Sequence, residues 1–213
     1  MHRHAPAPRL TALLVAATAA TAAAVAAAGT YNPDRSIGDV VPAWEALPGT
    51  DGRDHGWADV ADKTAVVVVF TCNSCPYAVD LEGRLNALAR RYAAADAPVA
   101  VVAINSNRIP EDAPEAMRRR ALEQEFAFPY LFDESQEVAK AFGAVRTPEC
   151  FVIDGDRRIV YMGAFDDAPD GRNVGRRHVD EAVAALLAGV AVEIAETPPV
   201  GCQIRFARRR NPR

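Results

Sequence analysis

The stretch that decides the fold reads Ala65-Val66-Val67-Val68-Val69-Phe70-Thr71-Cys72-Asn73-Ser74-Cys75-Pro76-Tyr77. Its first six residues are apolar and mostly β-branched, which predicts a strand that is buried on both faces. The helical spacing of apolar residues from 77 to 95 then places the CxxC pair at a strand-to-helix turn. Because the N-terminus of a helix favours a thiolate, we expect Cys72 and Cys75 to form a redox dithiol with Cys72 as its nucleophile.

Strands and helices alternate along the rest of the chain. Further strands are expected at 99–104 and 130–132, and a hairpin at 151–153 and 159–162. Helices are expected at about 114–126, 135–142 and 177–187, with Pro114 in a first turn and Gly143 after a last one. The pattern predicts an α/β fold in which a central mixed β-sheet is flanked by helices.

Residues 1–28 have the composition of a signal peptide. A basic start is followed by an Ala/Leu/Val-rich segment at 10–24 and by Ala26-Ala27-Ala28, a small-residue cleavage site. We therefore expect an exported protein, periplasmic or secreted, with a domain at 29–194 and a C-terminal tail at 195–213. An uncleaved membrane anchor is the alternative, because the apolar segment is nearly long enough to span a membrane, and only in that case is a membrane partner expected.

The charge of the chain argues against nucleic acid as a partner. The net charge is −4, and removal of residues 1–28 takes away two arginines and no acidic residue, which leaves −6. A basic cluster between Arg205 and Arg213 lies at the extreme C-terminus. We expect that cluster to be a solvated, frayed tail.

All four cysteines would be exported into a compartment where disulfides persist: Cys72, Cys75, Cys150 and Cys202. The spacing favours pairing of the first two. The other two are then free, paired with each other, or auxiliary redox groups that pass electrons to the dithiol. A structural zinc site needs a second closely spaced pair, and only His55 and His178 are available, so we expect no metal and no other cofactor.

A second signature lies at Arg146-Thr147-Pro148-Glu149-Cys150, where a proline enters a predicted strand and marks an edge, a bulge or a cis turn. Together with the CxxC pair, the order of elements from about Ile37 to Leu187 resembles the thioredoxin fold, whose cis-proline loop faces the dithiol. The opening Ile37-Gly38-Asp39, with Leu47-Pro48 and Gly52, looks like the N-terminal extension of the redoxin group, the alkyl hydroperoxide reductase/thiol-specific antioxidant superfamily. Four strings look like exported peroxiredoxin-like, thioredoxin-domain proteins of bacteria: residues 70–77, Ala103-Ile104-Asn105-Ser106-Asn107, residues 130–134, and Thr197-Pro198-Pro199-Val200-Gly201-Cys202.

The resemblance leaves a choice between two activities. Peroxiredoxins carry P-x-x-x-T-x-x-C and an arginine that binds the peroxide. With Cys75 on the peroxidatic position, Cys72 takes the place of the threonine and Val68 that of the proline, while Arg146 is out of register by two residues. The resemblance therefore implies a thiol-disulfide oxidoreductase, in which Cys72 attacks a disulfide and Cys75 resolves the mixed disulfide. A thiol peroxidase is the alternative, and a non-enzymatic module that binds copper or zinc is a further one.

The same resemblance implies roles around the dithiol. Pro148 would hold the substrate-facing loop, and Thr147 would present its backbone to a disulfide-containing protein or small molecule. Glu149 would take the proton of Cys75, unless it is a surface residue. Cys150 either reaches the dithiol or packs in the core, and the core is favoured. Cys202 is part of the last of the four matching strings, but the resemblance assigns it no role. The sequence leaves the redox partner unidentified.

Overall fold

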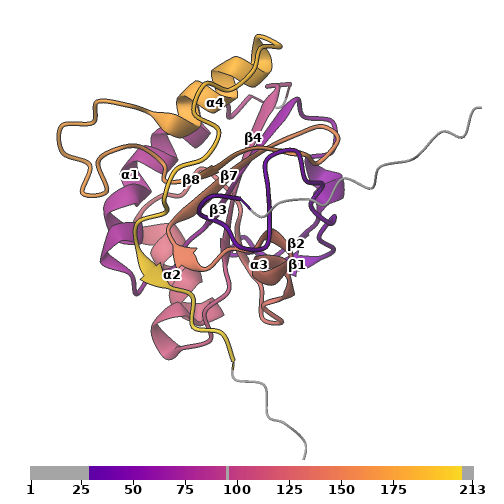
Figure 1. Cartoon of the computed structure of the whole chain (residues 1–213). Helices are drawn as coiled ribbons and strands as arrows, with labels where there is room; N and C mark the ends of the chain where they lie inside the picture. The colour runs from indigo at the N-terminus through magenta and orange to yellow at the C-terminus, as the bar shows by residue number, and fades with distance from the viewer. Residues whose placement is uncertain (1–28, 95, 208–213) are drawn as a thin grey trace, which may run out of the picture.

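A five-stranded mixed sheet forms the centre of the protein (Figure 1). The computed structural model describes residues 29–94 and 96–207. The strands stand in the order β5-β4-β3-β7-β8. The first three of these, β5, β4 and β3, are parallel, and β7 is antiparallel to both of its neighbours. Their bounds are Ala65–Phe70 for β3, Val99–Asn105 for β4, Tyr130–Phe132 for β5, Glu149–Asp154 for β7 and Ile159–Gly163 for β8. The predicted mixed sheet and the β7–β8 hairpin are confirmed.

Helices cover both faces of the sheet, which explains why β3 is apolar throughout. On one face, Val67 and Val69 belong to the core under α1 (Pro76–Arg91), α2 (Pro114–Glu123) and α4 (His178–Leu187). On the other face, Val66, Val68 and Phe70 belong to the core under α3 (Glu137–Phe142) and the N-terminal segment. Every residue of β3 is fully buried. The central strand therefore holds its end, and the CxxC pair after it, in a fixed place.

The helix boundaries follow local backbone chemistry. The helix α2 begins at Pro114, as predicted. The helix α3 begins at Glu137, two residues later than predicted, because Gln136 has a left-handed backbone with φ of 63°. Gly143, with φ of 65°, ends that helix as predicted, since glycine adopts this region without a steric cost. In α4, His178 is buried, and its ring stacks against that of Tyr161.

Short elements complete the chain at both ends of the described part. The N-terminal extension forms β1 (Leu47–Pro48), β2 (Asp54–His55) and the 3-10 turn η1 (Trp57–Asp59), and a second 3-10 turn, η2 (Pro110–Asp112), precedes α2. Near the C-terminus, β9 (Cys202–Gln203) pairs antiparallel with β6 (Arg146–Thr147). Figure 1 shows this yellow C-terminal segment running back over the body of the protein.

The C-terminal segment is packed against the domain up to residue 207. Ile204 is buried, and its backbone N–H donates to the carbonyl of Val145 at 2.9 Å. The N–H of Arg205 donates to Asn107 Oδ1 at 2.8 Å. The expectation of a frayed tail is therefore wrong at Arg205, where the basic cluster begins, because its backbone N–H is satisfied within the fold. The rest of the cluster, at 208–213, lies outside the described residues.

Three parts of the chain lie outside the described residues. They are the predicted signal peptide at 1–28, residue 95 and the last six residues, 208–213. Within 29–94 and 96–207, no helix is both long and apolar enough to cross a membrane.

Candidate active site

The dithiol and the cis-proline loop meet at the end of β3. Cys72 lies between β3 and α1, and Cys75 is the residue that immediately precedes α1. The peptide bond Thr147-Pro148 is cis, as predicted, and β7 brings it beside β3. The Sγ atom of Cys72 lies 3.4 Å from Thr147 Oγ1, and the Cys75 thiol donates to the Thr147 carbonyl at 2.8 Å. Both thiols therefore contact the same residue of the loop.

The electrostatics of the dithiol favour a thiolate at Cys75, whereas Cys72 remains the predicted nucleophile. A hydrogen bond between the two thiols has the largest effect, since it raises the pKa of Cys72 and lowers the pKa of Cys75. Burial raises the pKa of Cys72 further, whereas Cys75 also interacts with Cys202 and with the backbone of Ala78 in α1. The hydrogen bond from Cys75 to the carbonyl of Thr147 acts in the opposite direction. Cys75 can donate it only as a protonated thiol, so this contact disfavours the Cys75 thiolate. The helix N-terminus acts on Cys75 because that residue, and not Cys72, caps α1.

A buried carboxylate fixes the loop between the two cysteines. Asp112 accepts hydrogen bonds from the backbone N–H and the hydroxyl of Ser74, at 2.9 and 2.7 Å, and from the side-chain amide of Asn107 at 2.9 Å. The amide of Asn105 donates to the carbonyl of Asp112 at 2.6 Å. The negative charge of the Asp112 carboxylate also contributes to the raised pKa of Cys72. The sequence reasoning missed Asp112, although it quoted the two asparagines that hold it.

Glu149 lies at the start of β7, opposite Phe70 of β3. Its carboxylate accepts hydrogen bonds from the backbone N–H groups of Val145 and Arg146, at 2.8 and 3.0 Å. Burial raises its pKa to about 7, even though these two donors lower it. Glu149 is thus a buried residue and not a surface one. Among the described residues, its carboxylate binds the backbone just before the cis-proline and makes no hydrogen bond with the thiol of Cys75.

Cys150 packs in the apolar core. It lies opposite Val69 in the β3–β7 pairing and belongs to the core under α1 and α4, whereas Cys72 and Cys75 form a separate small cluster with Ala78. Burial raises the pKa of Cys150 well above its ordinary value. A thiol that is kept neutral in this way is a poor nucleophile.

Cys202, in contrast, joins the dithiol. It lies directly opposite Thr147 in the β6–β9 pairing, and its side chain is exposed. Its strongest electrostatic interaction is a hydrogen bond with Cys75, which raises the pKa of Cys202. The structure thus brings together four of the residues singled out in the sequence: Cys72, Cys75, Thr147 and Cys202.

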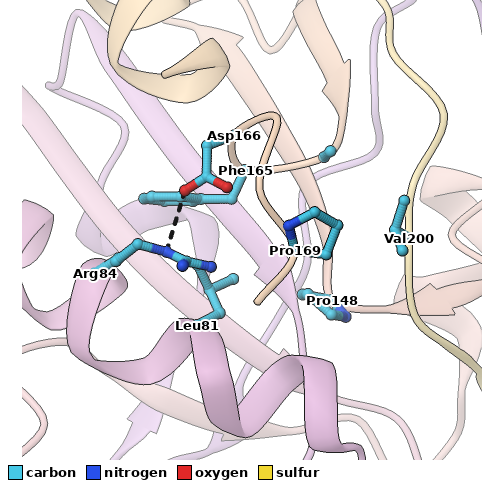
Figure 2. A pocket seen from close by; sticks show the side chains of 8 residues that line it. Leu81, Arg84, Pro148, Phe165, Asp166, Pro169 and Val200 are labelled. Atoms are coloured by element: carbon cyan, nitrogen blue, oxygen red, sulfur yellow. Dashed lines mark ion pairs between the residues drawn. The ribbon is translucent and has the colours of Figure 1, made fainter. Parts of the chain in front are cut away.

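A small pocket opens beside the cis-proline. Its apolar walls come from Leu81 of α1, Phe165, Pro148, Pro169 and Val200. Figure 2 shows an ion pair on one side of this pocket and Val200 of the C-terminal segment on the other. The ion pair joins Arg84 Nε to Asp166 Oδ2 at 3.1 Å. Pro148, which lines the pocket, directly follows Thr147, the residue that both thiols contact.

Among residues 29–94 and 96–207, no group of three or more His, Cys, Asp or Glu side chains is arranged to hold a metal ion.

Comparisons with known proteins agree with this geometry. A family model described as Redoxin matches residues 27–177. The chain is 37% identical to a hypothetical protein from Sinorhizobium meliloti, with a TM-score of 0.75 over 81% of this chain and 96% of the other. It is also 37% identical to an uncharacterized conserved protein from Geobacillus kaustophilus, with a TM-score of 0.74 over 81% and 93% of the two chains. The peroxidoxin BcpB from Mycobacterium tuberculosis is 25% identical, with a TM-score of 0.55 over 71% and 96%. No protein of curated function matches the chain significantly.

Proposed function

The chain belongs to the redoxin family, and on that premise we propose that it is a thiol-disulfide oxidoreductase that works through Cys72 and Cys75. The observation that carries the proposal is the contact of both thiols with Thr147, the residue before the cis-proline. This arrangement holds two sulfur atoms together beside a loop that a disulfide-containing protein or small molecule can approach.

The reaction transfers two electrons. When the protein acts as a reductant, the two thiols become the Cys72–Cys75 disulfide, and the substrate disulfide becomes two thiols. A thiolate attacks a substrate sulfur, a mixed disulfide forms, and a second thiolate displaces the remaining substrate thiol. The reverse sequence oxidises a substrate dithiol. The redox potential of the couple against that of its partner sets the direction.

The proposed setting is outside the cytoplasm. Residues 1–28 have the pattern of a signal peptide, and an oxidising compartment suits a protein whose chemistry is disulfide exchange. A redox partner in that compartment would restore the starting state of the dithiol. Fractionation of cells that express the full chain tests this part, and recovery of the protein in the cytoplasm with residues 1–28 intact would contradict it.

Reduction of insulin by the purified protein, with dithiothreitol as electron donor, tests the activity. We expect turnover by the wild-type protein and its loss in the double variant Cys72→Ser, Cys75→Ser. The control is Cys150→Ala, which removes a thiol of the core and leaves the dithiol in place. Wild-type turnover by the double variant would sink the proposal.

Peroxidase activity is the second candidate, and the similarity to the mycobacterial peroxidoxin favours it. Against it, Val68 is buried within the sheet at the place of the peroxiredoxin proline, and Cys72 stands at the place of the threonine. Rapid consumption of hydrogen peroxide by the reduced protein, retained in Cys72→Ser, would favour the peroxidase.

A further inference from the structure

The dithiol is closed off from solvent, although its proposed reaction requires contact with a substrate disulfide. Cys72 is 2% exposed and Cys75 is 1% exposed. An attacking thiolate must approach the substrate sulfur along the axis of the disulfide bond, and neither buried thiol offers that approach in this conformation. Cys202 is the exposed cysteine of the chain.

The C-terminal segment holds Cys202 beside the dithiol. The register of β6 and β9 places Cys202 opposite Thr147, whose carbonyl accepts the hydrogen bond from Cys75. The guanidinium of Arg146 donates to the carbonyl of Gly201 at 2.9 Å, which fixes the residue before Cys202. Ile204, two residues further, is buried. Contacts on both sides of Cys202 thus fix its backbone.

Gly201 makes this close approach possible. A Cβ atom at position 201 would lie 2.0 Å from the Thr147 carbonyl oxygen and 2.6 Å from its carbon. Both contacts are with backbone, so a side chain at this position would push β9 away from the cis-proline loop. The segment therefore requires glycine next to Cys202 in order to reach the same carbonyl that Cys75 contacts.

The electrostatics of the three thiols agree with their placement. Cys202 interacts with Cys75 through its side chain and its backbone, and both interactions lower the pKa of Cys75. The same hydrogen bond raises the pKa of Cys202. The interaction therefore favours the thiolate at Cys75 over the thiolate at Cys202, so Cys202 has to lose its proton before it attacks and Cys75 has to give up its hydrogen bond to the Thr147 carbonyl.

We propose that Cys202 is the thiol that exchanges with the substrate, and that it passes the disulfide inward to Cys75 and then to Cys72. The proposal rests on the proposed function and adds the route between the buried dithiol and its substrate. It is a relay of three thiols in which β9 carries the outermost one.

Each step of the relay conserves sulfur bonds and electrons. Cys202, after loss of its proton, attacks the substrate disulfide, forms a Cys202–substrate disulfide and releases one substrate thiol. The Cys75 thiolate then attacks Cys202 Sγ, forms the Cys75–Cys202 disulfide and releases the second substrate thiol. Finally, deprotonated Cys72 attacks Cys75 Sγ, forms the Cys72–Cys75 disulfide and returns Cys202 to the thiol. One substrate disulfide gains two electrons and two protons, and the dithiol loses them.

Trapping experiments on the full chain distinguish the relay from direct exchange. The reduced variants are treated with glutathione disulfide, the remaining thiols are alkylated, and the pairs are mapped by mass spectrometry. We expect Cys72→Ser to stop at a Cys75–Cys202 disulfide, and Cys75→Ser to stop at a mixed disulfide between Cys202 and glutathione. Glutathione found on Cys75 in the first variant, or on Cys72 in the second, would overturn the relay.

Rates supply the second measurement. We expect Cys202→Ser to exchange with glutathione disulfide about tenfold more slowly or worse, because the buried thiols must then be uncovered first. Gln203→Ser is the matched control on the same strand and should keep the wild-type rate. A wild-type rate in Cys202→Ser would overturn the relay while leaving the proposed function intact, whereas absence of exchange in the wild-type protein would overturn both.

A glycine substitution tests the placement without removing a thiol. We expect Gly201→Ala to slow exchange as Cys202→Ser does, since the added Cβ displaces β9. The matched control is Gly83→Ala in α1, where a Cβ atom meets nothing within 4 Å. Circular dichroism and the free energy of unfolding show whether each variant is folded. A folded Gly201→Ala protein that exchanges at the wild-type rate would contradict the relay.

Discussion

Replacement of Glu149 by glutamine should change how the stability of the protein depends on pH. The carboxylate is 2% exposed and accepts the backbone N–H groups of Val145 and Arg146, just before the cis-proline loop. Burial raises its pKa from 4.5 to about 7. The glutamine side chain has nearly the same shape, and its carbonyl oxygen can accept the same two hydrogen bonds. The substitution therefore removes the titration and keeps the acceptor.

The sign follows from where the proton is bound. Between pH 4.5 and 7 the unfolded chain has lost this proton while the folded chain still holds it, so the free energy of unfolding falls as the pH rises through this window. At about 1.36 kcal/mol per pH unit, the loss attributable to Glu149 amounts to about 3 kcal/mol. Its contribution is complete below pH 4.5 and absent above pH 7. Glu149→Gln should match the wild-type stability near pH 4 and exceed it by about 3 kcal/mol near pH 8.

Urea unfolding of both proteins at half-unit steps from pH 4 to pH 8 measures this difference. Glu134→Gln serves as the control, because it removes the same charge from an exposed position. Its profile should run close to that of the wild-type protein. Parallel profiles for wild type and Glu149→Gln across pH 4.5 to 7 would refute the argument, as would a variant that is less stable at every pH.

Two further predictions concern the scaffold around the site. Phe142 is fully buried, with ring centroids 5.3 and 5.2 Å from those of its two phenylalanine neighbours, so Phe142→Ala should lower the free energy of unfolding by about 3–5 kcal/mol. Urea unfolding measures this loss of stability, with Leu122→Ala at a 76% exposed position as the control. If both variants lost the same free energy of unfolding, the packing of Phe142 would contribute less than expected. Arg84→Met should cost about 3 kcal/mol in the same assay, because it leaves the carboxylate of Asp166 buried without its partner. Arg172→Met, in an exposed ion pair, is the control, and an equally small effect of both would show that the pair beside the pocket contributes little.

Local sequence patterns predicted much of this protein. The four consecutive valines between Ala65 and Phe70 predicted a strand covered on both faces, and the structure confirms β3 in that place. The alternation of strand-like and helix-like hydrophobic patterns predicted the mixed sheet and its helices. The motifs around Cys72 and Thr147 predicted the redoxin fold, which the family match confirms. These features could be predicted because the spacing of hydrophobic residues, the helix caps and the turn residues each depend on only a few neighbouring positions in the chain.

The tertiary structure alone decided which groups surround the dithiol. No local pattern indicated that β9, Cys202–Gln203, returns to pair with β6, since contacts between residues more than 50 positions apart depend on how the intervening elements pack. The same packing buried Glu149, placed Asp112 against Ser74 and set Cys75 at the cap of α1. The pKa of each group depends on desolvation and on neighbouring charges and donors, which no spacing of residues reveals. For this reason the sequence identified the dithiol, and the fold was needed to show that the exposed Cys202 lies opposite Thr147, which both buried thiols contact.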